Sequence, residues 1–315
     1  MDGPRRRGAL VRAVEASTPL EEAPAGLGDG RPLFLKREDV HELGAFKWRG
    51  ALPVLERYRS NGADAVVTAS TGNHGAATAW AAKRVGMGAT VYAPAAASPA
   101  KLAHVERFGA ELVLTGADLD AAKEEARAYA EKRDVPFFED GAEREQYFGY
   151  QMIGAEILDD LDEPPAAVAV PVGNGALLGG IGMEICRRSP DTERIGVAPK
   201  QAPVMARSWE EGHVVEGERS ETFADGLAVR VAVPLAVRVL GEVATGFVLV
   251  SERSLAEALG AYARAGIRVE GAAAAALAAL PEVQADGPIV LVVTGRNIDD
   301  ELFTRALEQP DSFPD

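Results

Sequence analysis

Lys47 stands in a setting where a lysine could act as a nucleophile. It lies in the stretch KREDVHELGAFKWRGA, after Phe46 and before the pair Trp48 and Arg49. A lysine amine that is removed from water becomes neutral more readily, and a neutral amine can form a Schiff base with a carbonyl compound. The same residue could equally be a surface lysine whose stem covers apolar neighbours. The residues alone leave both interpretations open.

A second group of chemically capable residues is the run STGNHG from Ser70 to Gly75, which lies between a strand-like and a helix-like stretch. Backbone N–H groups at a helix N-terminus lack partners within the helix and favour an anion such as a carboxylate. Ser, Thr and Asn also cap helices for purely structural reasons. Anion binding and simple capping are both consistent with this run.

The glycine-rich stretch PVGNGALLGG, from Pro171 to Gly180, again follows an apolar run. Glycines let the backbone approach a phosphate closely, and the dipole of the following helix favours its charge. The glycine spacing also resembles a loosened dinucleotide fingerprint, so a dinucleotide-dependent oxidoreductase is an alternative. That fingerprint needs an acid at the end of the next strand, where residues 196–200 read GVAPK. The missing acid weakens the dinucleotide hypothesis.

Thr294 ends the last apolar run, PIVLVVT, and begins the sequence TGRN. The C-terminal ends of strands in open α/β sheets face the ligand crevice, so this hydroxyl could reach a bound ring. A turn formed by TGRN is the structural alternative.

The elements that must position these residues follow from an alternation of apolar runs with amphipathic stretches, which is typical of parallel strands joined by crossover helices. In the first series we expect the strands ADAVVTAS, ATVYAP, AELVLTG and VPFFED, separated by helices. A long helix near EREQYFGYQMIGAEILDDL opens a second series, with the strands AAVAVPV, RIGVAP, GFVLVS and PIVLVVT. The final residues QPDSFPD are expected to form a frayed tail.

Composition excludes several classes of function. The 315 residues carry 48 acidic and 33 basic side chains, a net charge of −15, so we expect no nucleic-acid partner. No stretch reaches the roughly 20 apolar residues of a membrane span, and no secretory signal is evident, so we expect no membrane partner and a cytoplasmic location. A single cysteine excludes an intrachain disulfide.

Taken together, in this order and with these gaps, the four segments resemble the fold-type II pyridoxal-phosphate enzymes, in particular the threonine/serine dehydratase and serine racemase branch. The resemblance runs from Thr18 to Asn297 and includes LKRED, KLAHVERFGAELVL and ADGLAV. It implies a two-domain, three-layer α/β/α fold with mostly parallel sheets, like that of the tryptophan synthase β chain. We expect a large cofactor-binding domain at 1–59 and 141–315 and a small inserted α/β domain at 60–140, with the cofactor in the cleft between them.

The resemblance also implies roles for individual residues. Lys47 would bind pyridoxal 5′-phosphate as a Schiff base, Phe46 would lie beside the pyridine ring, and Thr294 would meet the ring nitrogen. Glu270, in the segment IRVEGAAAA, would lie near the ring. The backbone expected to cradle the phosphate is that of Gly173, Asn174, Gly175, Ala176 and Leu177.

The run STGNHG takes its implied roles from the same resemblance. Asn73 would bind the 3-hydroxyl of the ring, and Thr71 would join Lys47 as a catalytic residue on the opposite face. The residues expected to receive the substrate carboxylate are Ser70, Thr71, Gly72, Asn73 and His74. Few acidic residues are expected in the cleft.

The implied reaction is α,β-elimination of water from a β-hydroxy amino acid such as threonine or serine, giving a 2-oxo acid and ammonia. Lys47 would remove the α-proton, and the hydroxyl would leave with a proton from the phosphate. The elimination product would then hydrolyse to the 2-oxo acid and ammonia. A neutral hydroxyl at the ring nitrogen does not hold that nitrogen protonated, so transamination is disfavoured. An amino acid racemase and a β-replacement enzyme of the same fold are alternatives, as is a non-catalytic pyridoxal-phosphate-binding protein.

Several positions depart from the family pattern. Ala45 replaces the usual serine, the phosphate loop reads GNGAL instead of GGGGL, and Tyr150 stands where dehydratases commonly have glutamine, so the substrate preference could differ. Ala198 replaces the first acid of the family's cation site, and we therefore expect no metal site of that type. The chain is expected to hold one catalytic core without a regulatory domain, and the resemblance suggests a homodimer.

Overall fold

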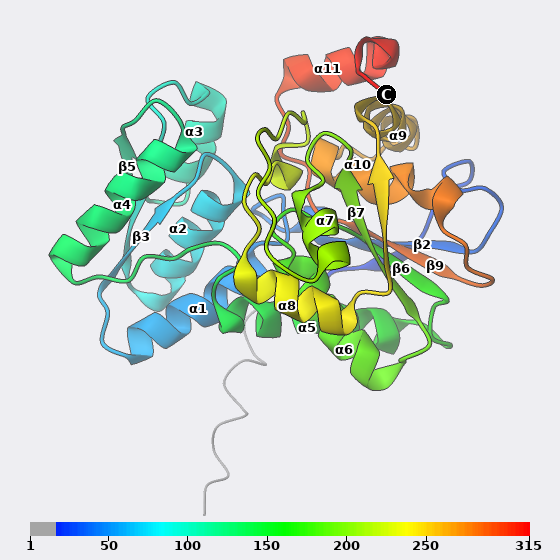
Figure 1. Ribbon diagram of the computed structural model, residues 1–315, viewed down its shortest axis with the longest axis horizontal. Coiled ribbons are helices and arrows are strands. Elements are labelled where there is room, and N and C mark those ends of the chain that lie inside the picture. Colours follow the sequence, from blue (N-terminus) through cyan, green and yellow to red (C-terminus); the bar gives the residue numbers. More distant parts are fainter. Residues whose placement is uncertain (1–16) are drawn as a thin grey trace, which may run out of the picture.

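The computed structural model describes residues 17–315, which form two lobes built around two separate sheets (Figure 1). The larger sheet has six strands in the order β1-β2-β9-β6-β7-β8. Its strands are β1 (Leu20–Glu22), β2 (Leu33–Arg37), β6 (Ala167–Pro171), β7 (Glu193–Pro199), β8 (Gly246–Val250) and β9 (Ile289–Val293). Every pair in this sheet is parallel except β1 with β2. β2, near the start of the chain, thus pairs with β9, the last strand.

The two faces of the large sheet are covered by different helices. Along β6, Ala167 and Ala169 join one core cluster, while Val168 and Val170 join the other, as the alternation of a strand requires. The first cluster includes the helices α9 (Glu252–Arg264) and α10 (Gly271–Ala278), and the second includes α5 (Arg144–Asp160), α6 (Ala176–Arg188) and α8 (Pro234–Val243). Both faces are buried, which explains why these strands are apolar throughout.

The smaller sheet has three parallel strands in the order β3-β4-β5. They are β3 (Ala65–Ala69), β4 (Gly88–Ala93) and β5 (Glu111–Leu114). Val66 packs toward α2 (Asn73–Val85), whereas Val67 packs toward α4 (Leu119–Arg133), so this lobe also has three layers. The helix α3 (Pro99–Glu106) joins β4 to β5, and α1 (Trp48–Ser60) packs against both α2 and α5. The domain boundaries at 60 and 140 remain a prediction.

The expected fold class, two units of three α/β/α layers with mostly parallel sheets, is confirmed. One expected strand is wrong, because VPFFED makes only an isolated bridge between Phe137 and Val67. The expected frayed tail is also wrong. Phe313 is buried, its ring centroid lies 4.7 Å from that of Phe223, and a 3₁₀ turn spans Pro310–Ser312. The helices α7 (Val204–Glu211) and α11 (Asp300–Glu308) complete the α-helices of residues 17–315. No helix in this part of the chain is long and apolar enough to cross a membrane.

A buried ionic cluster fixes the start of α1 against β2 and α5. The Arg49 guanidinium donates from Nε to Glu38 at 2.8 Å and from Nη1 to Glu156 at 2.7 Å. Lys36, which is fully buried, lies 2.6 Å from Glu156 and donates to the carbonyl of Thr18 at 2.6 Å. Two cations therefore face two carboxylates, so the buried charges balance. Because Arg49 follows Lys47 by two residues, this cluster also fixes the position of the Lys47 backbone.

Candidate functional site

A cavity of about 1050 Å³ lies between the two lobes, and all four sequence motifs line it. Of the fourteen site residues expected from the sequence, thirteen line its wall; the exception is Ala176, which is buried behind the wall. The thirteen are Phe46, Lys47, Ser70, Thr71, Gly72, Asn73, His74, Gly173, Asn174, Gly175, Leu177, Glu270 and Thr294. The fold thus brings together segments that are up to about 250 residues apart in the sequence.

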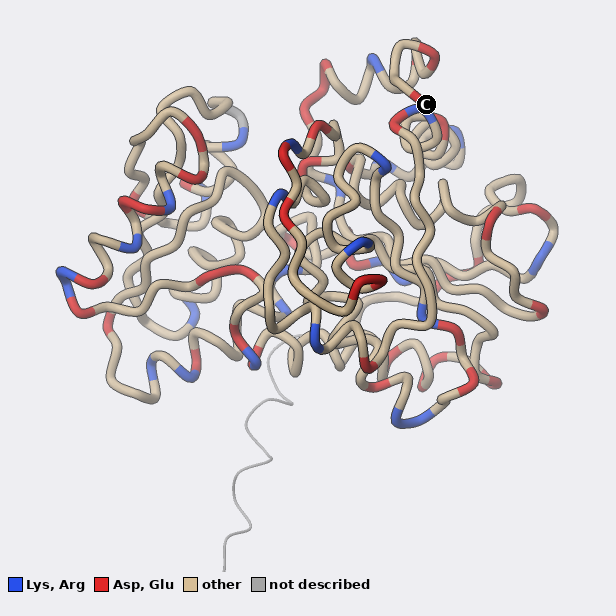
Figure 2. Tube along the Cα trace, in the orientation of Figure 1, with Lys and Arg blue, Asp and Glu red and all other residues tan. Residues whose placement is uncertain are grey.

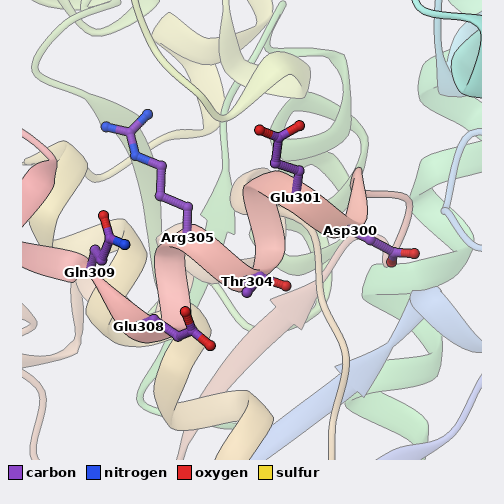
Figure 3. A pocket seen from close by; sticks show the side chains of 6 residues that line it. All are labelled: Asp300, Glu301, Thr304, Arg305, Glu308 and Gln309. Carbon is purple, nitrogen blue, oxygen red and sulfur yellow. The ribbon is translucent and has the colours of Figure 1, made fainter.

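A second hollow lies on the outer side of α11, and Figure 3 shows the side chains that line it. They are Asp300, Glu301, Thr304, Arg305, Glu308 and Gln309. These are surface residues of a single helix and its end, and none belongs to a motif. The cavity between the lobes is therefore the candidate active site.

Lys47 immediately precedes α1 and reaches into the cavity with a side chain that is 15% exposed. Its Nζ atom lies 2.6 Å from Oδ2 of Asp140 and 4.9 Å from the centre of the Phe46 ring. The backbone of Phe46 is held to the last strand, since its N–H donates to the carbonyl of Thr294 at 3.0 Å. The lysine is therefore a partly buried, ion-paired group, and the hypothesis of an ordinary surface lysine is wrong.

Asp140 is a residue that sequence reasoning missed. Its Oδ1 accepts a hydrogen bond from Nε2 of Gln146 at 2.9 Å and lies 3.7 Å from Nδ1 of His74. Burial tends to raise the pKa of this carboxyl, but the Lys47 ammonium and the Gln146 hydrogen bond outweigh burial and leave its pKa well below the usual range. A signal for it existed: Asp140 and Gly141 form a turn-type pair one residue after the apolar run VPFF, and three of the four motifs also follow apolar runs.

The run STGNHG connects the C-terminal end of β3 to the N-terminus of α2, which begins at Asn73. Ser70 accepts through Oγ from the N–H of Gly72 at 3.1 Å, which shapes the turn. The His74 ring points away from this turn, since its Nε2 lies 3.0 Å from Oγ1 of Thr68. Burial lowers the pKa of His74, so the ring is neutral at pH 7. The imidazole therefore adds no positive charge at the N-terminus of α2.

Asn73 is held between a carboxylate and a second amide. It donates through Nδ2 to Glu270 at 3.0 Å, and its Oδ1 accepts from Nδ2 of Asn297 at 2.7 Å. Asn297 also donates to the carbonyl of Leu43 at 2.8 Å, so it fixes which side of the Asn73 amide faces the cavity. Burial raises the pKa of Glu270 to about 7, although Asn73 and Lys47 act in the opposite direction. Asn297 is the second residue that sequence reasoning missed, although it lies within the TGRN motif.

The Thr294 hydroxyl is an unpartnered polar group in the wall of the cavity. Thr294 is 2% exposed, and its Oγ1 has no hydrogen-bond partner among residues 17–315. Burying a hydroxyl without a hydrogen bond is costly, and native structures rarely leave one so. A ligand atom that bonds this hydroxyl would remove that cost.

The glycine-rich loop meets the requirements of a phosphate cradle. A Cβ atom at Gly173 would lie 2.3 Å from the carbonyl oxygen of Gly226, and Gly175 has a φ of +91°, so both positions require glycine. The loop leads into α6, which begins at Ala176, and Gly175 and Leu177 on either side of this start line the cavity. Asn174, the departure from the family loop, accepts through Oδ1 from the N–H of Ala176 at 3.1 Å. The Ala176 N–H is therefore occupied by a side chain.

Tyr150, the residue that replaces the family glutamine, does not line the cavity. It is 1% exposed and packs behind Phe46, with ring centroids 5.2 Å apart. A direct contact of Tyr150 with the substrate is therefore excluded in this conformation, and any effect on preference would pass through Phe46.

The expectation of few acidic residues in the cleft is wrong. Seven carboxylates line the cavity: Asp118, Asp120, Glu139, Asp140, Asp225, Glu270 and Asp299. Four of the seven pair with bases that line the cavity as well: Glu139 with Lys123 and Arg127, Asp140 with Lys47, Asp225 with Lys101, and Asp120 with Arg230. Charged residues of both signs are spread over both lobes (Figure 2). Residues 17–315 contain no cluster of three or more His, Cys, Asp or Glu that could hold a metal ion.

These features fit one cofactor. A paired lysine, a glycine cradle at a helix N-terminus and a buried hydroxyl without a partner match the aldehyde, the phosphate and the ring nitrogen of pyridoxal 5′-phosphate. The two-lobed fold and this site define a pyridoxal-phosphate enzyme of fold type II.

Comparison with known proteins gives the same class. Residues 11–295 match the family model described as pyridoxal-phosphate dependent enzyme, and the chain belongs to this family. An L-threonine ammonia-lyase from Geobacter sulfurreducens is 34% identical over 285 residues, which cover 89% of this chain and 71% of that protein. The enzyme of the same name from Thermotoga maritima is 32% identical over 304 residues, covering 94% and 74%. A structure of the processed form of threonine deaminase isoform 2 from Solanum lycopersicum aligns with a TM-score of 0.87 and 30% identity, covering 93% of this chain and 88% of that one.

Proposed function

We propose that this protein is a pyridoxal-phosphate-dependent ammonia-lyase that eliminates water from a β-hydroxy amino acid such as threonine or serine. The observation that carries the proposal is the Thr294 hydroxyl, a neutral group without a partner where the ring nitrogen would lie. A neutral hydroxyl does not hold that nitrogen protonated, which favours elimination over transamination. The names of the two bacterial relatives support the same reaction.

The residues of the cavity have separate roles in this reaction. When bound, the cofactor supplies a Schiff-base carbon and a ring that accepts electron density from the substrate. Lys47 binds it and later takes the α-proton, while the backbone from Ser70 to His74 holds the substrate carboxylate. Asn73 would donate to the ring oxygen through the amide that also donates to Glu270, and the loop from Gly173 to Leu177 would hold the phosphate.

The alternatives differ in how strongly the site supports them. The family match overturns the dinucleotide-dependent oxidoreductase. A racemase needs a base on the face opposite Lys47. Thr71 lines the cavity, and the family resemblance assigns it to that face. Its branched side chain hinders the role of a base. A β-replacement enzyme and a non-catalytic binder remain outcomes of the experiment below.

We also propose that the enzyme is a cytoplasmic homodimer that acts on a free amino acid, with its small domain at 60–140. The single cysteine of the chain supports a compartment in which disulfides are not required. The resemblance to the dehydratase branch supports the dimer.

A panel of amino acids tests the function. We expect ammonia and a 2-oxo acid from at least one β-hydroxy amino acid, and a loss of at least about 1000-fold in kcat for Lys47→Ala. Borohydride reduction of the holoenzyme should add the mass of the reduced cofactor at Lys47. The matched control is Lys132→Ala, since Lys132 is exposed at the end of α4 and should keep full activity. Inversion without ammonia release would identify a racemase, and no turnover of any amino acid would identify a silent binder.

A further inference from the structure

We infer that Asp140 is a further catalytic residue of the proposed lyase, because its carboxylate stabilises the ammonium form of Lys47 that exists after this amine has taken the substrate's α-proton. The inference rests on the proposed function. The two side chains are in direct contact, with 2.6 Å between Nζ of Lys47 and Oδ2 of Asp140. A carboxylate at this distance favours the charged form of an amine.

A clamp holds Asp140 in this position. Gln146, which is 1% exposed, donates from Nε2 to Oδ1 of Asp140 at 2.9 Å and accepts through Oε1 from the N–H of Gly141 at 2.7 Å. The hydroxyl of Tyr147 donates to the carbonyl of Gly141 at 2.9 Å. Oδ1 is therefore engaged by the clamp, and Oδ2 is left to face the lysine.

The turn that carries Asp140 is also fixed against the phosphate loop. Gly141 has a φ of +87°, and a Cβ atom there would lie 2.9 Å from Cγ of Asn174. Only glycine allows this close approach. The carboxylate, the lysine and the glycine-rich loop thus have one fixed arrangement, which is the condition for electrostatic stabilisation without reorganisation.

The charges around Asp140 keep it ionised. Lys47 and the imidazole of His74 face it, and the phenols of Tyr147 and Tyr150 are the other titratable groups nearby. The pKa of Asp140 lies well below its usual range despite burial, because the Lys47 ammonium and the hydrogen bond from Gln146 favour the anion.

The α-carbon–hydrogen bond of the substrate breaks, and its proton forms a new N–H bond on Nζ of Lys47. The electron pair stays with the substrate and expels the β-hydroxyl, which would take its proton from the phosphate held by the glycine-rich loop and leave as water. Nζ thereby gains a positive charge next to Oδ2 of Asp140, so the carboxylate stabilises the charge where it develops.

The test compares the Asp140→Asn holoenzyme with wild type. We expect kcat to fall about 100-fold or more, and the isotope effect of an α-deuterated substrate on kcat to increase, because α-proton removal becomes slower. A second readout needs no turnover. The visible absorbance of the cofactor's Schiff base depends on a proton on Nζ, and its transition should shift to lower pH by about one unit or more.

Matched variants keep the test decisive. Asp134→Asn is the control, because Asp134 has a φ of +54° in the preceding turn, a conformation that Asn also tolerates. If Asp140→Asn folds poorly, the variant Gln146→Glu is tested in its place. The glutamate keeps an acceptor for the Gly141 N–H, but the group that donated to Oδ1 of Asp140 becomes a carboxylate oxygen. An unchanged absorbance transition together with an unchanged isotope effect in Asp140→Asn would overturn the inference. If wild type itself releases no ammonia, the proposed function fails, whereas the absorbance transition still reports on the pair of Asp140 and Lys47.

Discussion

The Thr294 hydroxyl can be recognised as a binding group because burying it without a partner destabilises the fold. This hydroxyl is buried and has no partner among the described residues, so without a ligand it destabilises the fold. We expect Thr294→Val to raise the free energy of unfolding of the cofactor-free protein by about 1–3 kcal/mol, yet to weaken cofactor binding. Urea unfolding and an absorbance titration with pyridoxal phosphate measure the two effects.

The control for this prediction is a buried threonine that has a partner. Thr68 donates through Oγ1 to the carbonyl of Phe138 at 2.8 Å, so Thr68→Val should destabilise the protein by about 1–3 kcal/mol. If both valine variants change the stability in the same direction, the Thr294 hydroxyl is not an unsatisfied group.

Glu270 predicts a pH dependence of stability. Burial raises its pKa from 4.5 in the unfolded chain to about 7, so the folded state binds its proton more tightly than the unfolded state. Stability is therefore lost as the pH rises from about 4.5 to 7, by up to roughly 3 kcal/mol. We expect Glu270→Gln to match wild type at pH 5 and to be more stable at pH 8, as measured by urea unfolding at both values. Equal differences at the two pH values would contradict a raised pKa.

At the scale of elements, the charged cluster beneath α1 links stability to activity. Replacing Arg49 by Met keeps much of the volume but leaves the carboxylates of Glu38 and Glu156 with Lys36 as their remaining cation. Breaking a buried pair in this way costs about 3–5 kcal/mol. We expect Arg49→Met to lower the free energy of unfolding by this amount and to lower kcat, because α1 positions Lys47.

The control is Arg187→Met on α6. Arg187 is 67% exposed and pairs with Glu184 three residues earlier, so its replacement should change stability by less than about 0.5 kcal/mol. A similar loss in both variants would mean that the cluster adds nothing beyond an ordinary surface pair.

How far the sequence predicts these elements depends on burial. The apolar strands β6 and β9 were predictable, since both faces of each are covered and apolar residues fill them. The strand β2 was not, because LFLKR ends in two charged residues, and a sequence does not reveal that Lys36 is buried by partners from α1 and α5. VPFFED has the composition of a strand, but its chain turns after Phe138 to bring Asp140 to the lysine.

At the scale of the whole molecule, two ion pairs connect the lobes at the rim of the cavity. Lys101 on α3 pairs with Asp225, and Arg230 lies 2.7 Å from Asp120 in α4. Both pairs are largely exposed, so each contributes about 0–1 kcal/mol and is screened by salt. We expect KM to rise by up to about fivefold between low salt and about 1 M salt. Steady-state assays of wild type and of the double variant Lys101→Ala/Arg230→Ala check this, since the variant should lose most of the salt dependence. A salt response that is equal in both proteins would show that these pairs do not control the lobes.

The motifs of the candidate site could be predicted from the sequence, but the contacts between residues of distant segments could not. Lys47, Asn73 and Thr294 stand in local patterns that a reader of the sequence can find. Asp140 and Asn297 act on those residues from segments far along the chain, and only the packing of the two lobes places them there. The charge of the cavity was mispredicted for the same reason, because pairing between lobes cannot be read from one segment.

The pairing of β2 with β9 has a consequence for the order in which the chain folds during synthesis. Leu33 is in register with Ile289, so the ribosome must make some 250 further residues before β2 gains this parallel neighbour. The sheet β3-β4-β5 lies between them in the sequence and pairs only with itself, so it can form much earlier. Lys47 lies ten residues after the end of β2 and therefore reaches its final place late. A nascent chain would therefore hold a folded small lobe well before it could bind the cofactor.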